Sequence, residues 1–193
     1  MYEPIKMNPA GVTHSFIYFS HSKMALEIER KFLVRSDDYK RMAYARADMR
    51  QGYIAAANGR TVRIRLRRET MLPEGTVQAD KAFLTIKGPS DDAGLSRYEF
   101  ETEVSVADGR DLMHIALPGI IDKTRWLVRM ADGHIFEVDE FHGANDGLVV
   151  AEVELASDDE SFCLPDFIDR EVTGDRRYYN SHLCRCPYQL WPK

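Results

Sequence analysis

Charged residues of one sign recur two positions apart in this chain, with apolar residues between and around them. Five such pairs stand in separate segments: Glu27 and Glu29, Arg63 and Arg65, Glu99 and Glu101, Lys123 and Arg125, and Glu152 and Glu154. Side chains two residues apart lie on the same face of a β-strand, so each segment predicts a strand with one charged and one apolar face. The chain is therefore constrained to form a sheet with one charged face.

Turn signals separate these segments and predict about eight strands. We expect strands over residues 26–34, 50–56, 61–67, 81–87, 97–106, 120–130, 134–141 and 148–155, with Asn58-Gly59 and Asp132-Gly133 as hairpin turns. Helical spacing predicts helices over residues 36–48, 108–116 and 175–183, the second capped by Asp108, and residues 69–80 are expected to form a loop. Many strands with few helices favour an antiparallel sheet or barrel, in an α+β, mainly β fold.

The length and composition bound the domain organisation and the partners. A chain of 193 residues suits one domain, which we expect over residues 24–193, after an irregular extension over residues 1–23. The formal net charge of −5 argues against a nucleic-acid partner, and no apolar run is long enough for a membrane span. Three cysteines, Cys163, Cys184 and Cys186, are typical of reduced thiols, so a cytoplasmic location is expected.

The charged strand faces can point outward, around an apolar lumen, or inward. Like charges so placed repel one another unless something binds them, and Thr, Ser and Gln, which are common on exposed strand faces, are scarce there. The inward arrangement explains this better: the charged faces line a tunnel and helices cover the apolar outer faces. Because buried charge is costly, acids, bases, a cation and an anionic ligand would compensate one another inside such a lumen.

The first predicted strand carries the most informative charged motif of the chain. Glu27 and Glu29 can hold a hard cation, and Lys31 beside them suits a phosphate. The pattern Glu27-x-Glu29-x-Lys31 resembles the signature of CYTH-domain proteins, the triphosphate tunnel metalloenzymes. Residues 61–65, 84–88, 98–101, 123–125 and 151–155 follow in the family's order, and residues 171–180 are similar to the tail of small bacterial members. The extension before Met24 departs from the family, whose signature normally lies at the N-terminus.

The resemblance implies an eight-stranded antiparallel β-barrel with a charged lumen, and a role for each charged position. The acids that would hold Mg²⁺ or Mn²⁺ are Glu27, Glu29, Asp139, Glu152 and Glu154. The bases that would bind phosphates are Lys31, Arg63, Arg65, Lys87, Lys123 and Arg125. The catalytic residues would be Lys31, Glu29 and Glu154.

Five further positions stay open or are expected to have a structural role. Glu99 and Glu101 are explained as well by salt bridges to the bases as by metal ligation. Arg176 or Arg177 either reaches the tunnel mouth or is exposed to solvent. Tyr53 falls where the family has an aromatic residue, and we expect it to pack in the tunnel wall.

The activity implied is divalent-metal-dependent hydrolysis of inorganic triphosphate to pyrophosphate and phosphate. Adenylate cyclase or thiamine-triphosphatase activity on the same fold is the enzymatic alternative, and a non-catalytic module that binds polyphosphate or nucleotide is the other. The expected partner is a small polyanionic substrate, with neither nucleic acid nor membrane, and a homodimer is left open.

Overall fold

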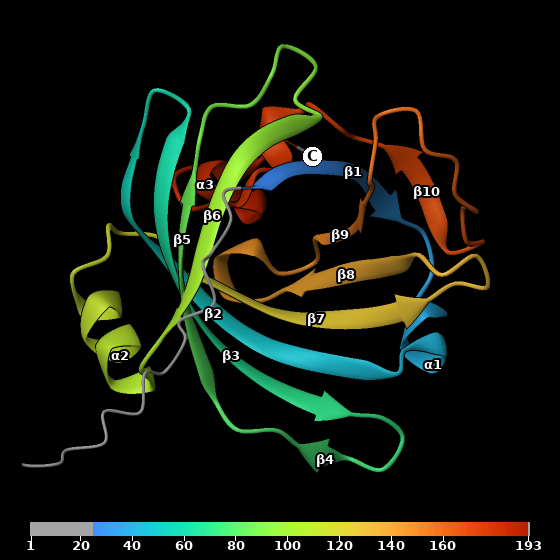
Figure 1. Ribbon diagram of the computed structural model, residues 1–193, viewed down its shortest axis with the longest axis horizontal. Helices are drawn as coiled ribbons and strands as arrows, with labels where there is room; N and C mark the ends of the chain where they lie inside the picture. Colours follow the sequence, from blue (N-terminus) through green and yellow to red (C-terminus); the bar gives the residue numbers. More distant parts are fainter. Residues whose placement is uncertain (1–24, 193) are drawn as a thin grey trace, which may run out of the picture.

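The computed structural model describes residues 25–192, so the predicted extension over residues 1–23 lies outside the described part. One antiparallel sheet closes on itself, in the order β1-β6-β5-β3-β2-β7-β8-β9 and back to β1. The eight strands of the ring are β1 (Ala25–Val34), β2 (Ala45–Ala57), β3 (Arg60–Met71), β5 (Lys81–Lys87), β6 (Ser96–Val104), β7 (Ile121–Arg129), β8 (Ile135–Phe141) and β9 (Val149–Glu154). The predicted eight-stranded antiparallel barrel is confirmed (Figure 1).

Two short strands extend this ring at its edges. β4 (Thr76–Val77) pairs with the end of β3, and β10 (Ile168–Glu171) pairs with the end of β1. Neither was predicted, because each has too few residues to show an alternating pattern. β4 and the end of β3 lie within residues 69–80, so the prediction of a loop there was wrong in part.

Tight turns join neighbouring strands, as predicted. Asn58 and Gly59 between β2 and β3 have φ values of 51° and 73°, the left-handed conformations that a two-residue type I′ hairpin requires. Gly133, between β7 and β8, has φ 96°. These connections fix the registers that place charged residues on one face of the ring.

The prediction of a helix over residues 36–48 was correct only for its first turn and wrong for the rest. Helix α1 (Tyr39–Met42) has four residues, and β2 begins at Ala45. The spacing of the alanines in this segment does not decide between helix and strand. As a strand, the segment gains hydrogen-bonded partners on both sides, from β3 and from β7. Tertiary pairing therefore overrides the local helical spacing.

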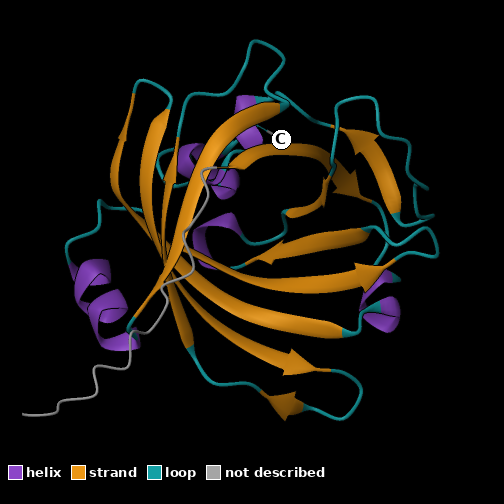
Figure 2. Cartoon of the chain, viewed as in Figure 1, coloured by secondary structure: helices purple, strands orange, loops and turns teal. Residues whose placement is uncertain are grey.

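Helix α2 (Val106–His114) lies outside the ring against β2, β3 and β5 (Figures 1 and 2). Its N-cap is Ser105, whose Oγ accepts a hydrogen bond from the Asp108 nitrogen at 3.0 Å, so the prediction of Asp108 as the cap was wrong. A Cβ on Gly109 would lie 2.5 Å from the Cβ of Ala82, which allows only glycine at this close approach of helix and sheet. No helix among residues 25–192 is long and apolar enough to cross a membrane.

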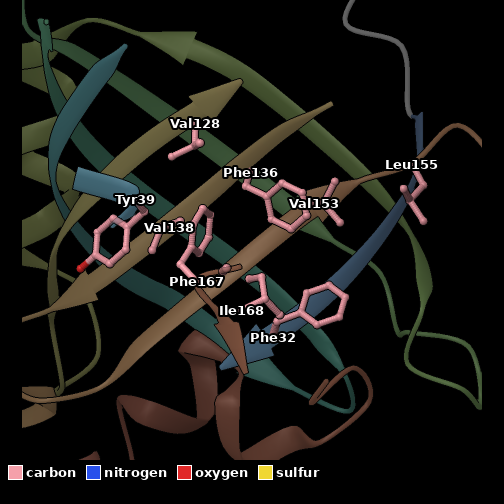
Figure 3. Close-up of a cluster of buried hydrophobic side chains, with 10 residues drawn as sticks. Phe32, Tyr39, Val128, Phe136, Val138, Val153, Leu155, Phe167 and Ile168 are labelled. Carbon is pink, nitrogen blue, oxygen red and sulfur yellow. The ribbon is translucent and has the colours of Figure 1, made fainter. Parts of the chain in front are cut away.

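The main apolar core lies on the outer face of the sheet. Phe136, Val138 and Val153 on β8 and β9 are fully buried there, covered by Tyr39 of α1 and by Phe167 (Figure 3). The side chains between them on the same strands point to the opposite, inner face. This is the arrangement expected if the charged faces form a lumen.

A second apolar cluster closes part of the inner face. Ile121, Phe141 and Val150 belong to it and have the strand parity of Lys123, which faces inward. The chain after β10 packs on them through η2 (Arg176–Tyr178), α3 (Asn180–Leu183) and η3 (Tyr188–Leu190). The helix predicted over residues 175–183 is thus two short turns with a break between them.

Candidate active site

A cavity of about 720 Å³ occupies the inside of the ring. Its charged lining includes the acids Glu27, Glu29, Glu99, Glu101, Glu137, Glu152 and Glu154 and the bases Lys31, Arg63, Arg65, Arg67, Lys87, Arg97 and Arg125. These residues come from seven of the eight ring strands, with Tyr53 contributed by β2. The inward orientation of the charged faces is confirmed.

Acidic residues of β1 and β9 stand opposite one another. Glu29 pairs in register with Glu154, and Lys31 with Glu152. Burial raises the pKa of Glu154, and the charges of nearby glutamates, Glu27 first among them, raise it further. Among the described residues, no base forms an ion pair with Glu154. This corner of the cavity therefore has an excess of negative charge, which favours a cation.

Glu27 and Glu29 are held by bases instead. Lys87 Nζ lies 2.8 Å from Glu27 Oε2, and Lys31 Nζ lies 2.9 Å from Glu29 Oε1. Arg97 contacts both carboxylates at 2.9 Å. Burial raises the pKa of Glu27, but Lys87 and Arg97 outweigh burial and lower it to about 2.

Two arginines of β3 face the cavity with too little negative charge around them. Both share the carboxylate of Glu101, with Nη2 at 3.3 Å for Arg63 and 3.1 Å for Arg65. The Nε–H groups of both arginines are buried and have no hydrogen-bond partner among the described residues. Burial lowers the pKa of Arg65 to about 10, and the charge of Arg63 contributes to this. Such a pair is completed by an anion with several oxygens.

Lys123 and Asp139 do not line the cavity, although both have the inward strand parity. Their side chains are each 1% exposed and form an ion pair with one another. Asp139 also accepts two hydrogen bonds from Arg125 at 2.7 Å, and Arg125 reaches on to Glu152 at 2.9 Å. Both residues thus stand behind Arg125, which is the one that meets the cavity.

The other open positions have defined places. Glu99 lies 2.6 Å from Lys87 Nζ, and Glu101 binds Arg65, which is the salt-bridge arrangement considered for both. Arg176 lines the cavity, while Arg177 is exposed and paired with Asp175.

Sequence reasoning left Arg97 and Glu137 of the cavity wall unassigned. Arg97 is two residues before Glu99 on the same strand face, but a search for same-sign pairs passes over it. Glu137 forms a same-sign pair with Asp139, so that search could have found it. Tyr53, expected in the tunnel wall, lines the cavity opposite Arg63, and burial raises its pKa to about 12. Its hydroxyl therefore stays protonated at neutral pH and can donate a hydrogen bond.

The donor set suits a hard divalent cation, since it offers carboxylate oxygens only. Within residues 25–192, however, no three His, Cys, Asp or Glu side chains are gathered closely enough to hold a metal ion as they stand. The oxygens of Glu27, Glu29 and Glu152 are turned toward lysines and arginines. A metal would have to replace some of these bases as the partner of the acids.

A family model of the CYTH domain matches residues 25–179. The chain belongs to the CYTH domain family. It is 41% identical over 167 residues to an inorganic triphosphatase of Acetivibrio thermocellus, covering 86% of this chain and 97% of that protein. It is 33% identical over 159 residues to an inorganic triphosphatase of Nitrosomonas europaea, covering 81% of this chain and 95% of that one.

The CYTH fold is also shared with a crystal structure of an inorganic triphosphatase. The two sequences are 31% identical, and the alignment covers 83% of this chain and 95% of that one. The structures superpose with a TM-score of 0.54. The CYTH match includes all strands of the ring but ends before α3 and η3. His182 and Arg185, which line the cavity, lie beyond that match.

Proposed function

We propose that this protein hydrolyses inorganic triphosphate to pyrophosphate and phosphate, with Mg²⁺ or Mn²⁺ as cofactor. The observation that carries the proposal is the pair Arg63 and Arg65, which line the cavity, share one carboxylate and have buried Nε–H groups without a partner among the described residues. Both curated relatives are inorganic triphosphatases, which supports the same reaction class. In this reaction a water oxygen bonds to a terminal phosphorus, and the bond from that phosphorus to its bridging oxygen breaks.

The acids at the β1–β9 side of the cavity would hold the cation. We assign Glu27, Glu29 and Glu154 as its ligands, with Glu152 completing the set. Bound there, the ion would neutralise charge on phosphate oxygens. Asp139 has a different role in this proposal. Because both its oxygens are bound by Lys123 and Arg125, it positions Arg125 from behind.

The bases on the other strands would bind the phosphate chain. Arg63 and Arg65 bind its oxygens through forked hydrogen bonds, and Lys87 and Arg125 contribute single contacts from neighbouring strands. Lys31 stands between Glu29 and Glu152, where it can stabilise the phosphoryl group that is attacked. Lys123 supports Arg125 through Asp139, and Tyr53 can donate its hydroxyl proton in a hydrogen bond from β2.

Phosphate release from inorganic triphosphate, ATP and thiamine triphosphate tests the proposal, each with Mg²⁺, with Mn²⁺ and with a chelator. Arg65→Ala should raise KM for triphosphate roughly tenfold or more, because a charge-assisted contact is lost. Arg68→Ala is the matched control, since Arg68 lies on the same strand with its side chain 60% exposed. It should leave the rate unchanged.

Three outcomes would overturn the proposal. Full activity in the presence of a chelator would show that the reaction needs no metal. Cyclic AMP as a product from ATP would favour the cyclase alternative. Tight binding of triphosphate without release of phosphate would favour a binding module. A cytoplasmic location, and action without nucleic acid or membrane, stay predictions that belong to the same proposal.

A further inference from the structure

Arg97 occupies the place between the two acids of the first strand. It lies on β6 directly opposite Glu27, and its side chain is 20% exposed at the cavity wall. Its Nε donates to Glu27 Oε2 and its Nη2 donates to Glu29 Oε1, both at 2.9 Å. Among the described residues, no other base contacts both carboxylates.

A divalent cation and Arg97 cannot share these carboxylates in this arrangement. A hard cation takes carboxylate oxygens at about 2.0–2.6 Å, depending on the ion, and needs several at once. Arg97 turns one oxygen of each acid toward its own guanidinium, and a second positive charge beside it would be repelled. The described acids are accordingly not gathered as a ligand set. Loading of an ion on Glu27 and Glu29 requires that Arg97 leave at least one of them.

An anion in the cavity would offer Arg97 a new partner. Its side chain lines the same cavity as Lys87 and Arg63, the bases assigned to the phosphate chain. We propose that Arg97 is an internal counter-cation of Glu27 and Glu29, which a divalent metal displaces and which then binds the phosphate chain. This inference rests on the proposed triphosphate site and adds a substrate-binding residue to it.

The exchange couples the two ligands. Without phosphate, metal binding must break the contacts of Arg97 with the acids, and the guanidinium gains no new contact in return. The affinity for the metal alone is therefore low. With phosphate present, the released guanidinium gains phosphate oxygens, so each ligand strengthens the binding of the other by the same factor. The chain would thus resist metal loading until substrate arrives.

Calorimetry on the full chain tests this with Mg²⁺ alone, and with the imido analogue of triphosphate in excess Mg²⁺. Arg97→Gln removes the charge and keeps much of the length of the side chain. It should tighten binding of Mg²⁺ alone about fivefold or more, a usual size for such coupling. It should weaken binding of the imido analogue in Mg²⁺ about tenfold, because a charge-assisted contact is lost. Arg68→Gln, on the exposed face of β3, should change neither.

The outcomes distinguish a failure of this inference from a failure of the proposed triphosphate site. If Arg97 is only a structural salt bridge, Arg97→Gln will lower the melting temperature and leave Mg²⁺ affinity equal or weaker, which overturns the inference. Unchanged affinity for the imido analogue in Mg²⁺ overturns the transfer to phosphate. Wild-type protein that binds no Mg²⁺ under any condition overturns the proposed metal site and this inference together. Arg97→Lys, which cannot bridge both acids as a fork, should fall between wild type and Arg97→Gln and serves if the glutamine variant does not fold.

Discussion

Lys123 and Asp139 form an ion pair across β7 and β8 in which each side chain is 1% exposed. Asp139 has a second basic partner, Arg125, while Lys123 has no second acid within hydrogen-bond distance among the described residues. The two members of the pair are therefore not equivalent, although they face each other.

Substitution of each residue should expose this difference. Asp139→Asn leaves two buried bases without their carboxylate, and loss of one partner from a buried pair costs about 3–5 kcal/mol. Lys123→Met should cost less, because Asp139 keeps Arg125 and the apolar side chain fills the space. Urea unfolding followed by circular dichroism measures both free energies. Equal losses, or a neutral Asp139→Asn, would contradict the arrangement described.

Substitution of Glu154 and of Glu29 should have the same effect on activity but different effects on stability. Both are assigned as metal ligands, so Glu154→Gln and Glu29→Gln should each abolish turnover of triphosphate. Glu154 has no basic partner among the described residues and its pKa is raised, so its neutralisation should not destabilise the fold. Glu29→Gln weakens contacts with Lys31 and Arg97 and should lower the melting temperature. Phosphate release and thermal melts on the same samples check this, and near wild-type turnover by either variant would refute the metal assignment.

Acid should destabilise the protein partly through Glu27. Its pKa falls from 4.5 to about 2 on folding, because Lys87 and Arg97 outweigh burial. The folded state then binds fewer protons than the unfolded one, so this contribution is present above pH 4.5 and is lost as the pH falls from 4.5 toward 2. Its size is on the order of 3 kcal/mol.

Unfolding free energies of wild type and Glu27→Gln between pH 7 and pH 2 isolate that contribution. The variant should be the less stable at neutral pH, and the gap should close in the acid range. A constant difference across all pH values would show that Glu27 does not titrate as described.

Inorganic triphosphate should have a higher kcat/KM than ATP with the same metal. The contacts proposed are all with phosphate oxygens, so a nucleoside adds bulk and the cost of its desolvation without a compensating partner. The preference should be clear at neutral to alkaline pH, where triphosphate carries its full charge. Ca²⁺ should inhibit, because its looser and larger coordination misplaces the phosphoryl group against the attacking water. Equal values for both substrates would count against a site built for phosphates alone.

Removal of residues 1–23 should leave folding and turnover nearly unchanged. The CYTH match begins at residue 25, and within residues 25–192 the cavity lining runs from Glu27 to Arg185. Rates and melting temperatures of the truncated and full chains make the comparison. An insoluble or inactive truncated protein would show that the extension takes part in the structure.

The alternation of charged and apolar residues predicted most of the fold. It failed where that alternation is weak, or where the degree of burial of a side chain matters. The ring strands were recognisable because charged and apolar residues alternate along them, but Ala45 and Ala47 at the start of β2 carry no such contrast. Arg97 was missed because its neighbour on the same face, Glu99, has the opposite charge. Alternation assigns Lys123 and Arg125 to one face equally, yet it cannot say that one is sealed behind the other, since that depends on the curvature of the closed sheet.

The segment that packs over Ile121, Phe141 and Val150 has a consequence for how such proteins diversify. The strands carry most of the charged side chains of the cavity, whereas His182 and Arg185, which also line it, lie beyond the residues that the CYTH model matches. The proposed chemistry and this part of the cavity lining are thus encoded in separate parts of the chain. A change confined to the tail could therefore alter this part of the lining while every charged side chain on the strands stayed in place.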